Sequence, residues 1–236
     1  MTLIKREPST GDLQNLLPVV CLLGGESTGK STLAQALQHR LERAHGLRVL
    51  LVPEYLRTWC EEKGRAPKLH EQAPIAHEQS RRICEAAQQP GVDLVIADTS
   101  ALMVAVYSEL YFADASLLHT ARAEQSRYAL HLLMGLDLPW TPDGLFRDSS
   151  AVRDATDTLL RRELDAARLP YQTIYGQQDA RLQQALRAVG RWLSQDLLPA
   201  DQALTEGRTP WRCDNCSDPD CERRLFTDLV GKKRLN

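Results

Sequence analysis

Five short apolar runs recur along the chain, and each one leads into a glycine or a polar turn. They cover residues 19–23, 48–52, 93–98, 128–134 and 171–175. Short, continuous apolar runs are typical of strands that are buried on both faces of a parallel sheet. Between the runs, apolar residues recur at helical spacing, as in Leu33, Leu37 and Leu41. This alternation predicts an α/β fold with a five-stranded, doubly wound parallel sheet.

The same pattern divides the chain into three parts. Residues 1–17 mix charged residues, proline and glycine without a period, and we expect a flexible lead-in there. Residues 18–195 hold the alternating strands and helices of one domain. In residues 196–236, prolines and a glycine interrupt any helical period and three cysteines cluster, so we expect a C-terminal extension.

The composition is that of a soluble globular protein, with 43% hydrophobic and 25% charged residues. The formal net charge of -2 does not favour a general nucleic-acid binder, which usually carries a basic excess. No apolar stretch approaches the ~20 residues that a transmembrane helix needs. We therefore expect a cytoplasmic protein without a membrane or nucleic-acid partner, and the sequence is compatible with a homo-oligomer.

The first apolar run leads into a complete phosphate-binding motif, G-x-x-x-x-G-K-S, which begins at Gly24. Its glycines let successive backbone N–H groups surround a phosphate, Lys30 can reach the β and γ phosphates, and Ser31 can ligate Mg²⁺. The helix that follows directs its N-terminal dipole at the same anion. A glycine-rich turn without a ligand is the alternative. The residues expected to bind ATP are Gly24, Gly25, Glu26, Ser27, Thr28, Gly29, Lys30, Ser31 and Thr32.

The third apolar run ends in an acidic residue, Asp98. In a phosphate-loop protein, an acidic residue at the end of a hydrophobic strand is expected to hold Mg²⁺ together with the loop hydroxyl, here that of Ser31. Thr99 and Ser100 follow, so a helix N-cap cluster is the alternative interpretation. Both interpretations hold together if a helix begins at residue 101.

The second apolar run is followed by a carboxylate, a phenol and a guanidinium, at Glu54, Tyr55 and Arg57. Open α/β sheets bind ligands at the carboxyl edge of their strands. We therefore expect these three side chains to bind the substrate. Alternatively, Glu54 and Arg57 are surface residues one helical turn apart.

A loop over residues 135–147 is rich in proline, glycine and aspartate and carries Trp140, which core packing alone does not explain. A helix is predicted over residues 151–169, with Arg147 at its approach and Arg153 in its first turn. Arginines that follow such a loop are typical of a helical kinase lid, where guanidinium groups stabilise charge on a transferring phosphoryl group.

Taken together, these motifs resemble the ribosylnicotinamide kinase domain of bacterial NAD-biosynthesis regulators and the wider AAA-like phosphate-loop family, from about residue 19 to 189. The resemblance implies a P-loop NTPase fold and transfer of the γ-phosphoryl group of ATP to the 5′-hydroxyl of a riboside, with nicotinamide riboside as the leading candidate. It also implies that Asp137 and Trp140 bind substrate. The motifs that carry it are residues 24–31, E-Y-x-R at 54–57, Glu78-Gln79, Asp98-Thr99, D-x-P-W at 137–140, and Asp143-Gly144.

Two positions depart from that family's pattern. The aromatic residues that sandwich the nicotinamide ring align with Pro53 and about Cys84 here, and neither offers a π face for stacking. Tyr55, Tyr107 and Trp140 are the aromatic residues that could replace them.

Phosphoryl transfer needs a phosphate cradle, a metal, a positive clamp and an oriented hydroxyl group. We assign the clamp to Arg147 and Arg153, and the carboxylate near the acceptor is Glu54 or Asp98, as proton acceptor or as positioner. Lys30 serves in the cradle. The alternative function is an ATP-dependent regulatory switch that phosphorylates no small molecule. GTP is disfavoured, because the guanine-reading N-K-x-D motif is absent from the sequence.

The extension carries a C-x-x-C-x-x-x-x-C cluster at Cys213, Cys216 and Cys221. Two thiolates at the first spacing can bind one zinc ion, although a closed structural site needs a fourth ligand. An iron–sulfur cluster is a less favoured variant. Free surface thiols or a redox pair are the alternatives.

Overall fold

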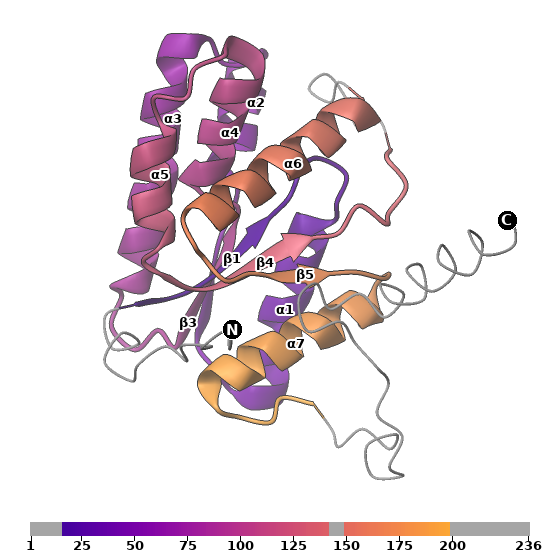
Figure 1. Cartoon of the computed structure of the whole chain (residues 1–236). Coiled ribbons are helices and arrows are strands. Elements are labelled where there is room, and N and C mark those ends of the chain that lie inside the picture. Colours follow the sequence, from indigo (N-terminus) through magenta and orange to yellow (C-terminus); the bar gives the residue numbers. More distant parts are fainter. Residues whose placement is uncertain (1–15, 142–148, 199–236) are drawn as a thin grey trace, which may run out of the picture.

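The computed structural model describes residues 16–141 and 149–198 (Figure 1). All strand pairs in the sheet are parallel, and the strand order is β2-β3-β1-β4-β5. This arrangement confirms the predicted five-stranded parallel sheet. The strands are β1 (Leu17–Leu23), β2 (Val49–Val52), β3 (Leu94–Asp98), β4 (Tyr128–Met134) and β5 (Gln172–Ile174).

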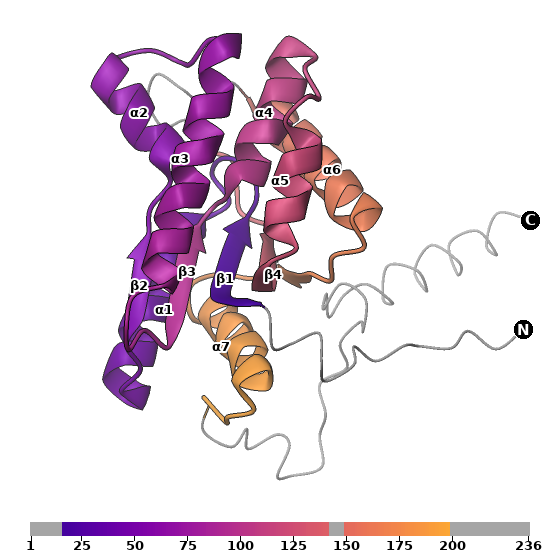
Figure 2. The same cartoon turned by 90° about the vertical axis from the view of Figure 1, so that its left-hand side faces the viewer.

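Helices cover both faces of the sheet (Figure 2). On one side α1 and α7 pack against it, and on the other α3, α4, α5 and α6. The helices are α1 (Lys30–His45), α2 (Tyr55–Lys63), α3 (Leu69–Ala87), α4 (Ala101–Phe112), α5 (Leu118–Gln125), α6 (Ser150–Ala166) and α7 (Asp179–Leu193).

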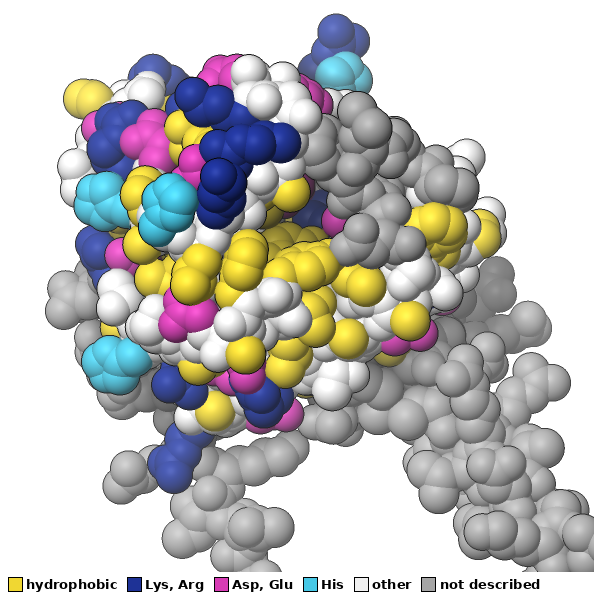
Figure 3. All heavy atoms as spheres, turned by 90° about the horizontal axis from the view of Figure 1, so that it is seen from above, with side chains coloured by type: hydrophobic (Ala, Val, Ile, Leu, Met, Phe, Trp, Pro, Cys, Tyr) yellow, Lys and Arg dark blue, Asp and Glu magenta, His cyan; other side chains and the backbone are white. Residues whose placement is uncertain are grey.

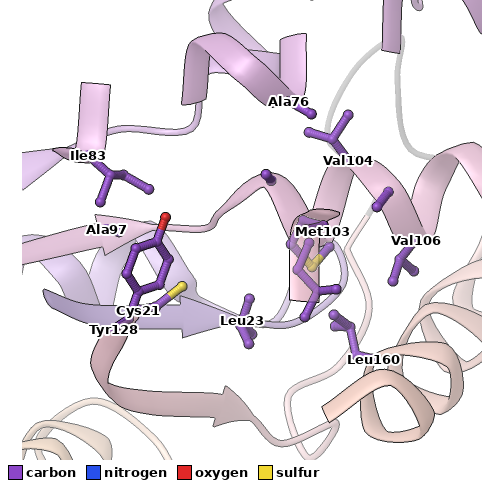
Figure 4. Close-up of a cluster of buried hydrophobic side chains, with 14 of the residues drawn as sticks. Cys21, Leu23, Ala76, Ile83, Ala97, Met103, Val104, Val106, Tyr128 and Leu160 are labelled. Atoms are coloured by element: carbon purple, nitrogen blue, oxygen red, sulfur yellow. The ribbon is translucent and has the colours of Figure 1, made fainter. Parts of the chain in front are cut away.

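The central strand β1 explains why its apolar run is continuous. Successive side chains of a strand point to opposite faces. Val19, Cys21 and Leu23 belong to the core that includes residues of α3 and α4, whereas Val20 and Leu22 belong to the core that includes residues of α1 and α7. Figure 4 shows the first of these cores, with side chains from the sheet meeting those of α3, α4 and α6. Both faces of β1 are therefore buried, as the doubly wound sheet requires.

The helix α2 is the element that the apolar pattern does not predict. The helix has only 9 residues, and its apolar ones, Tyr55, Leu56, Trp59 and Cys60, span too short a stretch to establish a helical period. Its N-cap is Glu54, and its C-cap is Gly64, in the left-handed conformation that favours glycine. The predicted substrate-binding residues Glu54, Tyr55 and Arg57 therefore lie at the N-cap and in the first turn of this helix, directly after β2.

No helix within residues 16–141 and 149–198 is long and apolar enough to cross a membrane. The division of the chain at residues 17/18 and 195/196 stays a prediction.

Candidate functional site

The carboxyl ends of the parallel strands lie at one edge of the sheet, and the chain from β1 to α1 forms the phosphate loop there. Two of its glycines have backbone angles that other residues rarely adopt, with φ of 148° at Gly24 and 78° at Gly29. A Cβ atom on Gly24 would lie 3.0 Å from the Cβ of Met134 and 3.0 Å from Oγ1 of Thr28. The loop conformation and the close packing on β4 therefore both require glycine at residue 24.

Lys30 lies inside this loop. The residue is only 8% exposed, and its Nζ donates to the carbonyl oxygens of Gly24 at 2.7 Å and Gly25 at 2.9 Å. The Thr28 hydroxyl also donates to the Gly25 oxygen, at 2.7 Å. Ser31 follows Lys30 in the first turn of α1 and is exposed. The loop therefore holds an ammonium group at the helix N-terminus, where the dipole also favours an anion.

Asp98 ends β3 next to the phosphate loop, because its Cα pairs in register with that of Leu22 in β1. The residue is 5% exposed, and its Oδ1 has no hydrogen-bond partner within the described part of the chain. A buried carboxylate oxygen without a partner is costly unless a ligand or metal satisfies it. The arrangement therefore fits a divalent cation, with Asp98 and Ser31 as candidate ligands.

The N-cap of α4 falls to Ser100, whose hydroxyl accepts from the backbone N–H of Leu102 at 3.3 Å. The helix begins at Ala101, so the N-cap at Ser100 and the acidic end of β3 at Asp98 occur together, as the two interpretations of this segment allow. Thr99, between them, has a φ of 74° and an Oγ1 without a partner among the described residues. Asp98 is therefore not the cap of α4, and its carboxylate can bind a metal ion.

Gln79 of α3 ties the ends of β2 and β3 together. It is 1% exposed, and its Oε1 accepts from the backbone N–H of Tyr55 at 2.7 Å. Its Nε2 donates to the carbonyl oxygens of Pro53 at 3.4 Å and Thr99 at 3.5 Å. Glu54 and Asp98 therefore extend from strand ends that one buried amide holds together.

The ring of Tyr55 is covered on one face by a cation. The guanidinium carbon of Arg82 lies 4.1 Å from the ring centroid, and Arg82 also pairs with Glu78 at 2.8 Å. Trp140 is half-buried, and its indole N–H has no partner within the described residues. Tyr107 is 7% exposed. Trp140 thus keeps a buried donor for a ligand, whereas Tyr55 has one of its faces occupied.

The first turn of α6 lies directly on the phosphate loop. A Cβ atom on Gly25 would lie 3.2 Å from Cγ of Arg153. The Arg153 Nη1 donates to the carbonyl oxygen of Leu138 at 2.8 Å, and the side chain is 10% exposed. The Ser27 hydroxyl also donates to the Thr141 oxygen at 2.9 Å. The predicted lid therefore contacts the loop through Arg153, while Arg147 lies outside the described residues.

The Asp137 carboxylate pairs with a buried arginine, Arg181, that none of the sequence motifs includes. Asp137 pairs with Arg181 of α7 at 2.6 Å and accepts from the backbone N–H of Gly176 at 2.6 Å. Arg181 and Gln79 share one sequence signal, because each is a polar residue four positions before a buried apolar one, Ala185 or Ile83.

The structure brings the phosphate loop, Asp98 and Arg153 into one neighbourhood, with Glu54 and Tyr55 at the next strand end along the edge. Arg57 is exposed on α2. Viewed from above, at the carboxyl ends of the strands, the molecule is hollowed, with apolar side chains in the hollow and Lys and Arg side chains along part of its rim (Figure 3). Cys213, Cys216 and Cys221 lie outside the described residues, so zinc or an iron–sulfur cluster there stays a prediction.

The sheet order, the phosphate loop and the acidic strand end define a kinase-like phosphate-loop fold. A sequence model of the family described as "AAA domain" matches residues 19–181, which is more than half of the chain, so the chain belongs to that family. No curated protein sequence matches the chain.

The solved structures that are similar to this one include two of the NadR protein. The NadR protein in complex with NR has a TM-score of 0.64 and 20% sequence identity, and the NadR protein in complex with NAD and AMP-PNP has a TM-score of 0.63 and 21% identity. Each match covers 80% of this chain and 55% or 53% of the NadR chain. This chain therefore spans about half the length of those relatives, and the likeness confirms the fold expected from the sequence motifs.

Proposed function

We propose that the protein is a kinase that transfers the γ-phosphoryl group of ATP to the 5′-hydroxyl of a riboside, with nicotinamide riboside as the leading candidate. The observation that carries the proposal is the buried Asp98 carboxylate, whose Oδ1 lacks a partner in the described part of the chain, at the strand end beside the phosphate loop. A glycine-rich turn without a ligand would leave this carboxylate oxygen unsatisfied, and an unsatisfied buried carboxylate lowers stability.

In this proposal, the phosphate end of the site binds MgATP. Backbone N–H groups of residues 24–32 bind the phosphates, and the Lys30 ammonium exchanges its loop carbonyls for phosphate oxygens. Ser31 and Asp98 hold Mg²⁺, which neutralises charge on the phosphates when it is bound. Arg153, which lies against Gly25, contributes positive charge from the lid, together with Arg147.

The acceptor end of the site comprises Glu54, Tyr55, Arg57 and Trp140 in this proposal. Glu54 or Asp98 orients the acceptor hydroxyl or takes its proton. The buried indole N–H of Trp140, which has no partner among the described residues, is available to a polar group of the acceptor. Each carboxylate oxygen of Asp137 already accepts a hydrogen bond, one from Arg181 and the other from the Gly176 N–H, so we assign it a positioning function in place of direct acceptor contact.

Nicotinamide riboside enters as the leading candidate because of the sequence motifs and because one of the similar NadR structures is a complex with NR. This chain stacks Arg82 on one face of Tyr55 and carries Pro53 and Cys84 where the related family has aromatic residues. A ring acceptor would therefore stack on the other face of Tyr55 or on Trp140.

The test is a panel of ribosides, including nicotinamide riboside, incubated with MgATP while ADP release is followed. We expect ADP release that depends on one riboside, and its loss in Lys30→Ala, because the ammonium that meets the phosphates is gone. Arg40→Ala is the matched control, since Arg40 is an exposed cation on the same helix. ADP release that ignores every riboside would favour an ATP-dependent regulatory switch and would overturn the kinase proposal.

A further inference from the structure

Arg181 of α7 is a buried arginine that joins three strand ends. It is 3% exposed, and its Nε donates to the carbonyl oxygen of Gly176 at 2.6 Å. One terminal nitrogen, Nη1, donates to the carbonyl oxygen of Thr28 in the phosphate loop. The other, Nη2, donates to the Gly135 carbonyl at 3.2 Å and to Asp137 Oδ1 at 2.6 Å. We call these five residues the Arg181 junction.

The junction links the segments that follow β1, β4 and β5. Asp137 closes it, because its second oxygen accepts from the backbone N–H of Gly176 at 2.6 Å. Burial lowers the pKa of Arg181 and the Asp137 carboxylate opposes that shift, while a guanidinium remains charged in proteins. The planar group with its five donors can serve several acceptors at fixed angles, which a single ammonium group cannot do.

The contact with Thr28 bears on the phosphate loop itself. In a trans peptide the C=O and the following N–H point to opposite sides of the same rigid plane. Because the Thr28 oxygen points at Arg181, the N–H of Gly29 points away from it. The Nη1 atom would lie 3.4 Å from a Cβ atom on Gly29, so the guanidinium packs against the Thr28–Gly29 peptide on the side of its carbonyl oxygen. The junction therefore fixes the direction of a backbone donor in the phosphate loop.

We propose that Arg181 is a positioning residue that holds the Gly29 N–H toward the phosphates of a bound nucleotide, with Asp137 as the residue that orients the guanidinium. The inference rests on the proposed function, since it assumes that the loop binds nucleotide phosphates. Through this hydrogen bond to the phosphate loop, α7 would affect the affinity for the nucleotide.

The main test compares Arg181→Lys with Arg191→Lys. The Lys variant at 181 keeps a positive charge beside Asp137 but cannot span the other acceptors. Arg191 lies on the same helix, is exposed and donates to the Gln172 side chain, so it controls for the substitution itself. Two quantities are measured: the Kd of MgATP by calorimetry and the rate of amide hydrogen exchange across residues 24–32.

For Arg181→Lys, we expect the Kd of MgATP to rise about tenfold or more, because hydrogen bonds that involve a charged group are lost. We also expect faster hydrogen exchange in the phosphate loop, with both quantities unchanged in Arg191→Lys. A purely structural role would lower the melting temperature without changing affinity or loop exchange in the folded protein. A folded Arg181→Lys protein with wild-type Kd and wild-type exchange would overturn the proposal.

Asp137→Asn keeps the inference testable if Arg181→Lys does not fold, because an amide retains an oxygen for the Gly176 N–H. Its Kd for MgATP should rise by a smaller factor, and an unchanged Kd with unchanged loop exchange would again count against the proposal. A wild-type protein that binds MgATP but phosphorylates no riboside would remove the kinase function and leave the affinity comparison intact. If the wild-type protein does not bind MgATP, nucleotide positioning by Arg181 is wrong as well.

Discussion

Around the phosphate loop most polar contacts reach backbone atoms, whereas around α2 many of them join side chains to one another. Lys30 and Arg153 both donate to carbonyl oxygens. On the other side, Arg82 lies over the ring of Tyr55, and Arg65 lies 5.1 Å from the ring centroid of Trp59. A site that binds its ligand through backbone groups allows few residue types, because the backbone must keep one conformation. A site that binds through side chains can become specific for another ligand when those side chains are substituted. In the proposed kinase, the phosphate end therefore identifies the class of reaction, and the acceptor end determines its substrate.

The largest effect is expected at the phosphate end, for Gly24→Ala. The new Cβ would lie 3.0 Å from that of Met134 at a φ of 148°, so the loop must shift. Backbone strain of this kind costs roughly 1–3 kcal/mol, and we expect MgATP binding to be lost. Gly46→Ala is the matched control, since its φ is also positive, 66°, but a Cβ there meets nothing within 4 Å. Equal MgATP affinity in the two variants would show that the close packing of Gly24 on Met134 is not needed for nucleotide binding.

The second prediction concerns Asp98→Asn. Removal of a buried charge whose Oδ1 has no partner among the described residues should leave the melting temperature unchanged or higher. Turnover with MgATP should fall at least about 100-fold, because the candidate metal ligand is lost. Calorimetric melting and steady-state kinetics measure the two quantities. A large loss of stability, or an unchanged rate, would indicate that Asp98 is a structural residue.

A third, smaller effect is expected at the acceptor end, for Gln79→Ala. The variant leaves the backbone N–H of Tyr55 without its partner, which costs about 1–3 kcal/mol of unfolding free energy. We expect the KM for the riboside to rise several-fold, with the Kd of MgATP unchanged. Gln88→Ala, at the exposed C-cap of α3, is the control. A rise in the MgATP Kd equal to the rise in KM would show that the two ends are not separable.

The smallest effect concerns the core beneath the site. Burial raises the pKa of both Cys21 and Cys60 to about 11, which disfavours the reactive thiolate. At about pH 8 the folded protein should therefore resist alkylation at both thiols, and reactivity should rise only as the pH approaches the raised pKa. Unfolding should expose both thiols at once. Peptide mass spectrometry after iodoacetamide treatment gives the result, and fast labelling of Cys21 in the folded protein would contradict the described core.

The sequence predicts the strands and the glycine-rich loop far better than the contacts around the end of β2, for a physical reason. The five strands and the loop from Gly24 to Ser31 depend on local requirements, namely apolar runs and glycine conformations. Gln79 enters only through the Glu78-Gln79 pair of the family resemblance, and no sequence motif includes Arg181, because the contacts of both residues depend on partners far away in the sequence. The sequence does not predict the helix α2, because its 9 residues are too few to establish a helical period. Only the folded chain shows that both side chains are buried and what they bind.

The central claim is that the phosphate end and the acceptor end act together in one phosphoryl transfer. The most direct measurement is mass spectrometry of the riboside after incubation with ATP that carries heavy oxygen in its γ-phosphoryl group. We predict a phosphorylated riboside that contains the labelled oxygens, formed by the wild-type protein and absent with Lys30→Ala. Labelled inorganic phosphate, with every riboside in the panel unchanged, would contradict the claim.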